Sequence, residues 1–262
     1  MLSQDDPAGP DLRDALLWVA SQEGRAADVH ALLAAGAFDR HALGNALAVA
    51  AANNHAGVAE VLIRNGAEAS YKNERFPQGA PLYCAAFFGS AEAARVLVQA
   101  GADVNSQSNS PLFAAARCGH PDIVQLLLDA NSDIAQGEYS PLLAAATRRG
   151  DIGIVRMLLD AKADANRPSG AYQRHPPMCA AARCNRSDIL ELLIAAKGSV
   201  DARSGFKASP ILLAAEHGCF EALQTLHRHG ARYQAARSRR GGTAHAAAAL
   251  PSQFSGPPSP TS

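Results

Sequence analysis

One short pattern recurs along the chain and decides the fold. It reads Pro81-Leu-Tyr-Cys-Ala-Ala-Phe-Phe-Gly89, Pro111-Leu-Phe-Ala-Ala-Ala-Arg-Cys-Gly119, Pro141-Leu-Leu-Ala-Ala-Ala146, Pro177-Met-Cys-Ala-Ala-Ala-Arg-Cys-Asn185 and Pro210-Ile-Leu-Leu-Ala-Ala-Glu-His-Gly218. Weaker copies begin at Leu16 and Ala46, so seven copies start 30 to 36 residues apart. Self-similarity at such a period is typical of stacked repeat architectures.

The residues around each copy predict a pair of helices. Ser110-Pro111 and Ser209-Pro210 place a hydroxyl at the N-cap and a proline at the first helical position, which both favour a helix start. A second apolar block follows each copy, as in Ile123 to Leu128. The unit is therefore helix, turn, helix and loop, and stacking of such units buries surface that none could bury alone.

Small residues predict where the second helices end. We expect a residue in the left-handed region to close the helix in the four copies with a Gly-Ala pair, at Gly36, Gly66, Gly101 and Gly230. Asn131 can take the same conformation at modest cost. Lys162 and Lys197 occupy this position in two other copies, and there we expect the helix to end differently because a long side chain disfavours that conformation.

The unit resembles the ankyrin repeat, whose consensus runs Thr-Pro-Leu-His-x-Ala-Ala-x-x-Gly before a Leu-rich helix and Gly-Ala-Asp-Val-Asn. The nearest match to the second part is Gly101-Ala-Asp-Val-Asn105. The resemblance implies an all-α fold, an α-solenoid of stacked helix-turn-helix ankyrin repeats with short β-hairpin or loop fingers. It also implies that Asn105 and Asn166 brace these loops, and in some ankyrin repeats this asparagine is a target of hydroxylation.

The domain organisation follows from this frame. We expect a disordered N-terminus at 1–11, an ankyrin repeat domain at 12–234 and a disordered tail at 235–262 that is rich in Ala, Ser, Pro, Gly and Arg. The expected repeats are 12–40, 41–75, 76–106, 107–137, 138–168, 172–203 and 206–234.

Composition agrees with a helical protein and excludes several classes. Ala accounts for 57 and Leu for 27 of the 262 residues, whereas aromatic residues make up 5%, so a sandwich or barrel is disfavoured. Lys and Arg number 24 and Asp and Glu 24, which argues against a nucleic-acid partner or an anionic membrane. No apolar stretch is long enough for membrane insertion. Five cysteines, an odd number, indicate reduced thiols and a cytoplasmic location, and Arg237 to Arg240 is a minimal nuclear signal.

Partner binding is expected on the concave surface, which in ankyrin repeats is formed by the loop fingers and by the first-helix positions just before the glycine. The segments 68–81 and 164–177 are the long loops and the first candidates for contact. Aromatic and arginine side chains are typical of binding hot spots. The predicted partner-binding residues are Tyr71, Lys72, Arg75, Phe76, Phe87, Phe88, Arg117, Tyr139, Arg148, Arg149, Tyr172, Arg174, His175, Arg183, Phe206, Lys207 and His217.

Charge on this predicted face favours an acidic partner. Its cations outnumber its acidic residues, which are Glu74, Glu138 and Glu216, whereas acidic residues such as Asp122 and Asp188 fall on or beside the second helices. The hypothesis is a protein partner with an acidic or phosphorylated segment, or an acidic patch. The simpler interpretation is that loops are polar in any protein.

Sequence motifs of catalysis are absent. The chain has no phosphate-binding glycine loop, no Gly-x-Ser-x-Gly elbow and no His-Glu-x-x-His motif. Cys179 and Cys184 are separated by four residues. A structural zinc site typically uses Cys-x-x-Cys pairs, so this spacing does not predict one. We therefore expect no enzyme activity, no metal, no cofactor and no small-molecule substrate.

Two function classes remain. The leading one is a non-catalytic protein-protein interaction module of the scaffold, adaptor or inhibitor type, because the fold alone does not choose among these roles. The alternative is a substrate-recognition adaptor of an enzyme assembly such as a ubiquitin ligase, or a host-directed effector.

Overall fold

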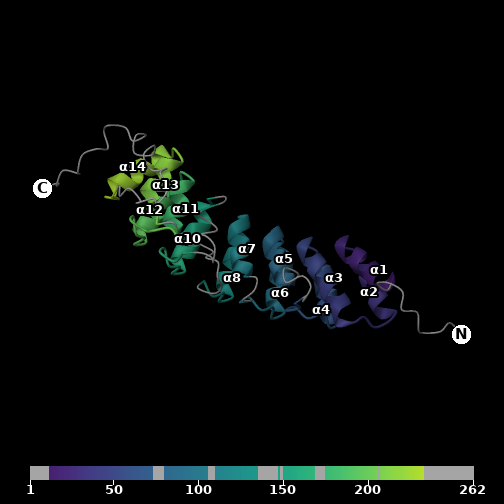
Figure 1. Ribbon diagram of the computed structural model, residues 1–262. Helices are drawn as coiled ribbons and strands as arrows, with labels where there is room; N and C mark the ends of the chain where they lie inside the picture. The colour runs from purple at the N-terminus through teal and green to yellow at the C-terminus, as the bar shows by residue number, and fades with distance from the viewer. Residues whose placement is uncertain are drawn as a thin grey trace. The chain divides into compact units, whose positions relative to one another are not determined.

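The computed structural model describes residues 12–72, 80–105, 110–134, 147, 150–168, 175–205 and 207–232. Within these residues it forms thirteen helices and no strand (Figure 1). The chain divides into two compact units, Met1–Asp133 and Ile134–Ser262, and each is described by itself. The predicted all-helical repeat fold is confirmed. The predicted end segments 1–11 and 235–262 lie outside the described residues.

Unit 1 consists of four helix pairs. The first helices of the pairs contact one another in chain order, and so do the second helices, which gives two rows (Figure 1). The pairs are α1 (Leu12–Gln22) with α2 (Ala26–Ala34), α3 (Arg40–Ala52) with α4 (Ala56–Arg64), α5 (Pro81–Phe88) with α6 (Ala91–Gln99), and α7 (Pro111–Cys118) with α8 (Pro121–Asp129).

Unit 2 repeats this arrangement over its described helices. The first helix α11 packs against α13, and the second helix α12 contacts both α10 and α14. Their bounds are α10 (Ile152–Asp160), α11 (Pro177–Arg183), α12 (Ser187–Ala195), α13 (Pro210–Glu216) and α14 (Phe220–Arg228).

The core explains the alanine content. The first helices bury small side chains such as Ala85 and Ala86 completely, which lets neighbouring helices approach closely. The second helices α4, α6 and α8 each bury a leucine completely at the same position, at Leu62, Leu97 and Leu127. Small residues on one row and large ones on the other thus fill the space between neighbouring repeats.

Proline starts the first helices as predicted, but the serine caps differ. Ser110 accepts a hydrogen bond from the backbone N–H of Phe113 at 3.2 Å, so it caps α7. Ser209 occupies the N-cap of α13 without making such a bond, and its hydroxyl is buried with no hydrogen-bond partner. The prediction of a hydroxyl cap is therefore confirmed at Ser110 and wrong at Ser209, where ψ is 159° instead of the 115° found at Ser110.

The helix ends correct two predictions. Gly66, Gly101 and Gly230 are left-handed as predicted, and so is Asn131. Lys162 and Lys197 are also left-handed, at φ 69° and 63°, which contradicts the prediction of a different helix end. Both lysine N–H groups and those of the next residues bond to the helix carbonyls, as they do at the glycines, and these bonds offset the backbone strain.

Gly36 does not adopt the left-handed conformation that we predicted. A Cβ atom at this position would lie 2.6 Å from Nη2 of Arg13. The glycine therefore makes room for the Arg13 side chain instead of closing the helix in the left-handed region.

Asparagine side chains brace the loops, as the resemblance implies. Oδ1 of Asn105 accepts a hydrogen bond from the N–H of Asp133 at 2.7 Å, one repeat further along. Oδ1 of Asn166 does the same for the N–H of Ser199 at 2.7 Å. Each asparagine thus ties its loop to the following one.

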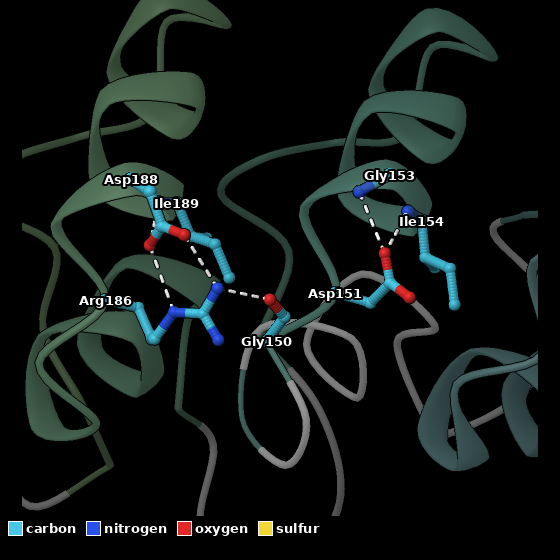
Figure 2. Close-up of polar contacts among 7 residues, drawn as sticks. All are labelled: Gly150, Asp151, Gly153, Ile154, Arg186, Asp188 and Ile189. Atoms are coloured by element: carbon cyan, nitrogen blue, oxygen red, sulfur yellow. Dashed lines mark hydrogen bonds and ion pairs between the residues drawn. The ribbon is translucent and has the colours of Figure 1, made fainter.

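Side chains at the start of the second helices also reach back to the preceding repeat. Nε2 of His55 lies 3.0 Å from the carbonyl of Gln22, and the hydroxyl of Ser90 donates to the carbonyl of Ala52 at 2.9 Å. In unit 2, Arg186 takes this place and donates from Nη2 to the carbonyl of Gly150 (Figure 2).

Figure 2 shows how the contact at Gly150 is supported on both sides. The carboxylate of Asp188 holds Arg186, with Nε at 3.0 Å and Nη2 at 2.7 Å from its oxygens. These bonds lower the pKa of Asp188 below its ordinary value. On the other side, Asp151 caps α10 by accepting from the N–H groups of Gly153 and Ile154.

Candidate protein-interaction surface

Five side chains of α5 and α7 form an aromatic-arginine cluster in unit 1, namely Tyr83, Phe87, Phe88, Phe113 and Arg117. The Phe87 ring is stacked at 6.1 Å from that of Tyr83 and is edge-on to that of Phe88 at 5.1 Å. Cζ of Arg117 lies 5.4 Å from the centre of the Phe87 ring and 5.7 Å from that of Phe113. Phe88 is 62% exposed, and the other four are partly buried.

Helix geometry brings these residues together. Tyr83 and Phe87 are four residues apart on α5, and Phe113 and Arg117 are four apart on α7, so each pair shares one helix face. Because α5 packs against α7, the guanidinium of one helix reaches the ring of the other. Both helices end at a left-handed glycine, which fixes the register of the cluster relative to the helix ends.

Arg117 is the only charged residue of α5 and α7. Among the described residues no carboxylate forms an ion pair with it, and its Nε is buried without a hydrogen-bond partner. Burial raises the pKa of Tyr83, and the nearby Arg117 partly offsets this effect. An arginine held over aromatic rings next to an exposed Phe is suited to binding, and the cluster contains no nucleophile paired with a base.

Unit 2 has a cleft of about 570 Å³ between its loops. Asn166 is held at its wall, because its side-chain amide donates to the carbonyl of Lys197 and accepts from the N–H of Ser199. Arg203 is the one charged residue of the lining, and its Nη1 donates to the carbonyl of Lys207 at 3.0 Å. The lining residues are Asn166, Pro168, Pro176, Ser199, Ala202, Arg203, Ser204 and Gly205.

Comparison with known proteins decides the family. The family model described as ankyrin repeats (3 copies) matches residues 16–108, 47–139, 107–169 and 142–237. The chain belongs to the ankyrin repeat family. Ankyrin repeats are generally protein-interaction modules, and the family is generally non-catalytic.

A solved structure agrees with this assignment. The crystal structure of the human ASB11 ankyrin repeat domain superposes with a TM-score of 0.70 at 26% sequence identity. The match covers 83% of this chain and 99% of the ASB11 chain. No curated protein matches the chain. Across the described residues, no helix has the length and apolar character needed to cross a membrane.

The aromatic-arginine cluster contains three of the residues that the sequence predicted to bind a partner. Phe87, Phe88 and Arg117 all occupy the positions just before the glycine, where binding was predicted, and the structure brings them into contact. Their role in binding a partner stays a prediction.

Tyr71 was predicted on a contact loop, and its burial contradicts that prediction. It is only 2% exposed, and its hydroxyl hydrogen-bonds with Nδ1 of His41 at 3.1 Å. The ring lies over Gly44 of α3, where the missing Cβ leaves room for it. Tyr71 is therefore a core residue and offers no surface to a partner.

Lys72 is exposed but already has a neighbour of opposite charge. Its Nζ lies 3.6 Å from a carboxylate oxygen of Asp103. Asp103 also accepts a hydrogen bond from the N–H of Asn105. The positive charge of Lys72 is thus partly balanced by the next loop.

The predicted residues of unit 2 fall in different surroundings. His175 is partly buried, and burial together with Arg183 lowers its pKa. Lys207 is exposed and left-handed. His217 is exposed, and its Nδ1 donates to the carbonyl of Leu213 at 2.9 Å. Outside the described residues lie Arg75, Phe76, Tyr139, Arg148, Arg149, Tyr172, Arg174 and Phe206.

Sequence reasoning missed Tyr83 and Phe113 as members of the cluster. They precede Phe87 and Arg117 by four residues, and this spacing was the available signal, because it places both on the face that carries the predicted residues.

The cysteines support a structural role. Cys179 is buried and Cys84 partly buried, and burial raises their pKa values to about 12 and about 11. Such thiols stay protonated and unreactive near neutral pH. Over the described part of the chain, no group of three or more His, Cys, Asp or Glu side chains is placed to hold a metal ion.

Proposed function

We propose that this ankyrin repeat protein is a non-catalytic interaction module, of the scaffold, adaptor or inhibitor type, that holds a partner protein on the aromatic-arginine cluster. The observation that carries the proposal is the Phe87 ring, which contacts both the exposed Phe88 ring and the guanidinium of Arg117. Aromatic residues and arginine are enriched among the hot spots of protein interfaces.

The proposed partner presents an acidic segment to this surface. Arg117 supplies the positive charge, and α5 and α7 carry no Asp or Glu that would repel such a segment. The five cysteines are an odd number and form no disulfide in the described residues, which supports a reducing compartment, the cytoplasm or the nucleus. We further propose that residues 12–234 act as one repeat domain.

Affinity capture from a lysate tests the proposal with three forms of the full chain. They are the wild type, the double variant Phe88→Ser/Arg117→Gln and the control Phe220→Ser. Phe220 is a suitable control because it is 55% exposed but belongs to α14 of unit 2 and is not a member of the cluster. Circular dichroism and thermal unfolding would first check that all three forms fold.

We expect the wild type and Phe220→Ser to recover the same protein partner. The double variant should recover at least roughly tenfold less of this partner. The reason is that the loss of each hot-spot residue costs more than about 1 kcal/mol of binding free energy. Equal recovery by all three folded forms would show that the cluster does not hold the partner.

A further inference from the structure

We propose that the aromatic-arginine cluster binds an extended acidic segment of a partner protein, in which a carboxylate side chain lies two residues from a bulky apolar side chain. The carboxylate would pair with Arg117, and the apolar side chain would pack on Phe88. This inference rests on the proposed function and names the chemistry of the partner.

The setting of Arg117 favours a carboxylate. The rings of Phe87 and Phe113 both contact its guanidinium, which restricts the side chain and lowers the entropy that binding would cost. Because Nε is buried, the terminal amino groups are the donors that a ligand can use. A carboxylate accepts two parallel N–H bonds from such a group, and these charge-assisted bonds are among the strong ones.

A phosphate fits the cluster less well. Phosphorylated segments are usually held by several arginines, because the group carries close to two negative charges at neutral pH. Arg117 is the only cation on α5 and α7. One cation balances one carboxylate, so the charge of the cluster matches Asp or Glu.

The second requirement comes from Phe88. Its ring is the most exposed of the cluster and is kept edge-on by Phe87. Arg117 contacts the same Phe87 ring, so the charge and the exposed ring are both next to Phe87. In an extended segment, side chains two residues apart point to the same side and are about 6.6 Å apart, a spacing that serves both contacts.

The C-terminal segment of the same chain is a poor occupant. Residues 235–262 contain no Asp or Glu and include the basic run Arg237 to Arg240, so they would repel Arg117. The same surface on a second copy also lacks a carboxylate, because α5 and α7 have none. Charge therefore argues against both the C-terminal segment and the same surface of a second copy as the occupant.

Selection from a library of random displayed peptides tests the proposal with the immobilised full chain. We expect the wild type to enrich sequences with Asp or Glu two residues from Phe, Tyr, Trp or Leu. Arg117→Gln should remove the acidic preference and keep the apolar one, and Phe88→Ser should weaken the apolar preference. The control Phe220→Ser should enrich the same sequences as the wild type.

An enriched peptide is then synthesised with Asp, Asn or phosphoserine at the acidic position, and its affinity is measured by fluorescence anisotropy. We expect the Asn form to bind the wild type roughly tenfold more weakly or worse, since a hydrogen bond to a charged group contributes about 1.5–3 kcal/mol. Arg117→Gln should bind the Asp and Asn forms equally.

Three results would overturn the carboxylate assignment: no enriched motif, an acidic preference that survives Arg117→Gln, or tighter binding of the phosphoserine form than of the Asp form. The proposed function would fail separately, by equal partner recovery with the Phe88→Ser/Arg117→Gln variant. The two proposals are therefore distinguishable.

Discussion

A Cβ atom placed on Gly44 would lie 2.3 Å from the ring of Tyr71, so the two residues pack without room for a methyl group. Glycine inside a helix such as α3 lowers helix stability by roughly 0.5–1 kcal/mol relative to alanine. The helix accepts this cost because the space above Gly44 holds a fully packed tyrosine whose hydroxyl bonds to His41. Packing therefore outweighs helix propensity at this residue.

Gly44→Ala should destabilise the protein although alanine is the better helix former. Moving the buried ring costs typically 1–3 kcal/mol, which exceeds the gain in propensity, so we expect a net loss of about 1 kcal/mol in the free energy of unfolding. Urea unfolding measures it. The control is Gly57→Ala on α4, because a Cβ atom at Gly57 would meet no atom within 4 Å. Ala46→Gly would not serve as a control, since it opens a cavity. Gly57→Ala should be neutral or stabilising, and a stable Gly44→Ala variant would contradict the packing argument.

Lys197 is held in the left-handed conformation at φ 63°, which is strained for any residue with a Cβ. Lys197→Gly should remove that strain, partly offset by the larger entropy of glycine in the unfolded chain. We expect a gain of about 1 kcal/mol or less, seen as a higher midpoint of urea unfolding. The reverse change Gly101→Lys, at φ 80° and with no atom within 4 Å of its Cβ, should lower the midpoint. A shift of both variants in one direction would refute the strain argument.

At the scale of the element, the start of α5 has an unused capping position. Ala80 has φ −64° and ψ 127°, close to the φ −68° and ψ 115° of Ser110, whose side chain caps α7. Ala80 makes no side-chain hydrogen bond to the helix. The backbone is therefore already placed for a capping residue.

Ala80→Ser should stabilise the protein by about 1 kcal/mol or less, because its hydroxyl can accept from the N–H of Tyr83. Thermal unfolding measures the effect as a higher melting temperature. Ser110→Ala should lower the melting temperature by a similar step. Ser209→Ala should change it little, because the hydroxyl of Ser209 is buried without a partner. A lower melting temperature for Ala80→Ser would show that a hydroxyl is not accommodated at this helix start.

Helices were predictable from the sequence because their signals are local. These signals lie within one repeat: proline at the first helical position, the Ala-Ala pair inside the helix and the glycine that follows it. The prolines correctly predicted the starts of α5, α7, α11 and α13. The burial of Tyr71 was not predictable in this way, because it depends on Gly44, a residue 27 positions earlier in the sequence. The left-handed lysines were missed for a related reason, since the hydrogen bonds of the helix end override the preference of one residue.

The candidate site was predictable in part. The position before the glycine indicated Phe87, Phe88 and Arg117 one by one, but not that they touch. Their contact depends on how α5 packs against α7, and this packing brings in Tyr83 and Phe113 as well. Pairing between neighbouring repeats is thus the information that a single repeat pattern lacks.

At the scale of the whole molecule, contacts are short-range in the chain. The helix contacts run within one pair and between neighbouring pairs, so stability is the sum of repeats and of the interfaces between them. His55, Ser90 and Arg186 each tie a second helix to the carbonyl of the preceding repeat. The loss of one such tie should therefore be felt locally.

Arg186→Met tests this locality. It removes the bonds to Gly150 and Asp188 (Figure 2) and leaves the buried carbonyl of Gly150 without its donor, which costs roughly 1–3 kcal/mol. A loss of this size should raise the rate of hydrogen-deuterium exchange in α10 and α12 by roughly fivefold or more. It should stay unchanged in α1 to α4 of unit 1. Arg156→Met is the control, because Arg156 lies on the exposed side of α10 and should leave exchange unaltered. An equal rise in α1 to α4 would instead mean that the chain opens as one cooperative body, since only then would a broken tie between two repeats lower protection in every other repeat.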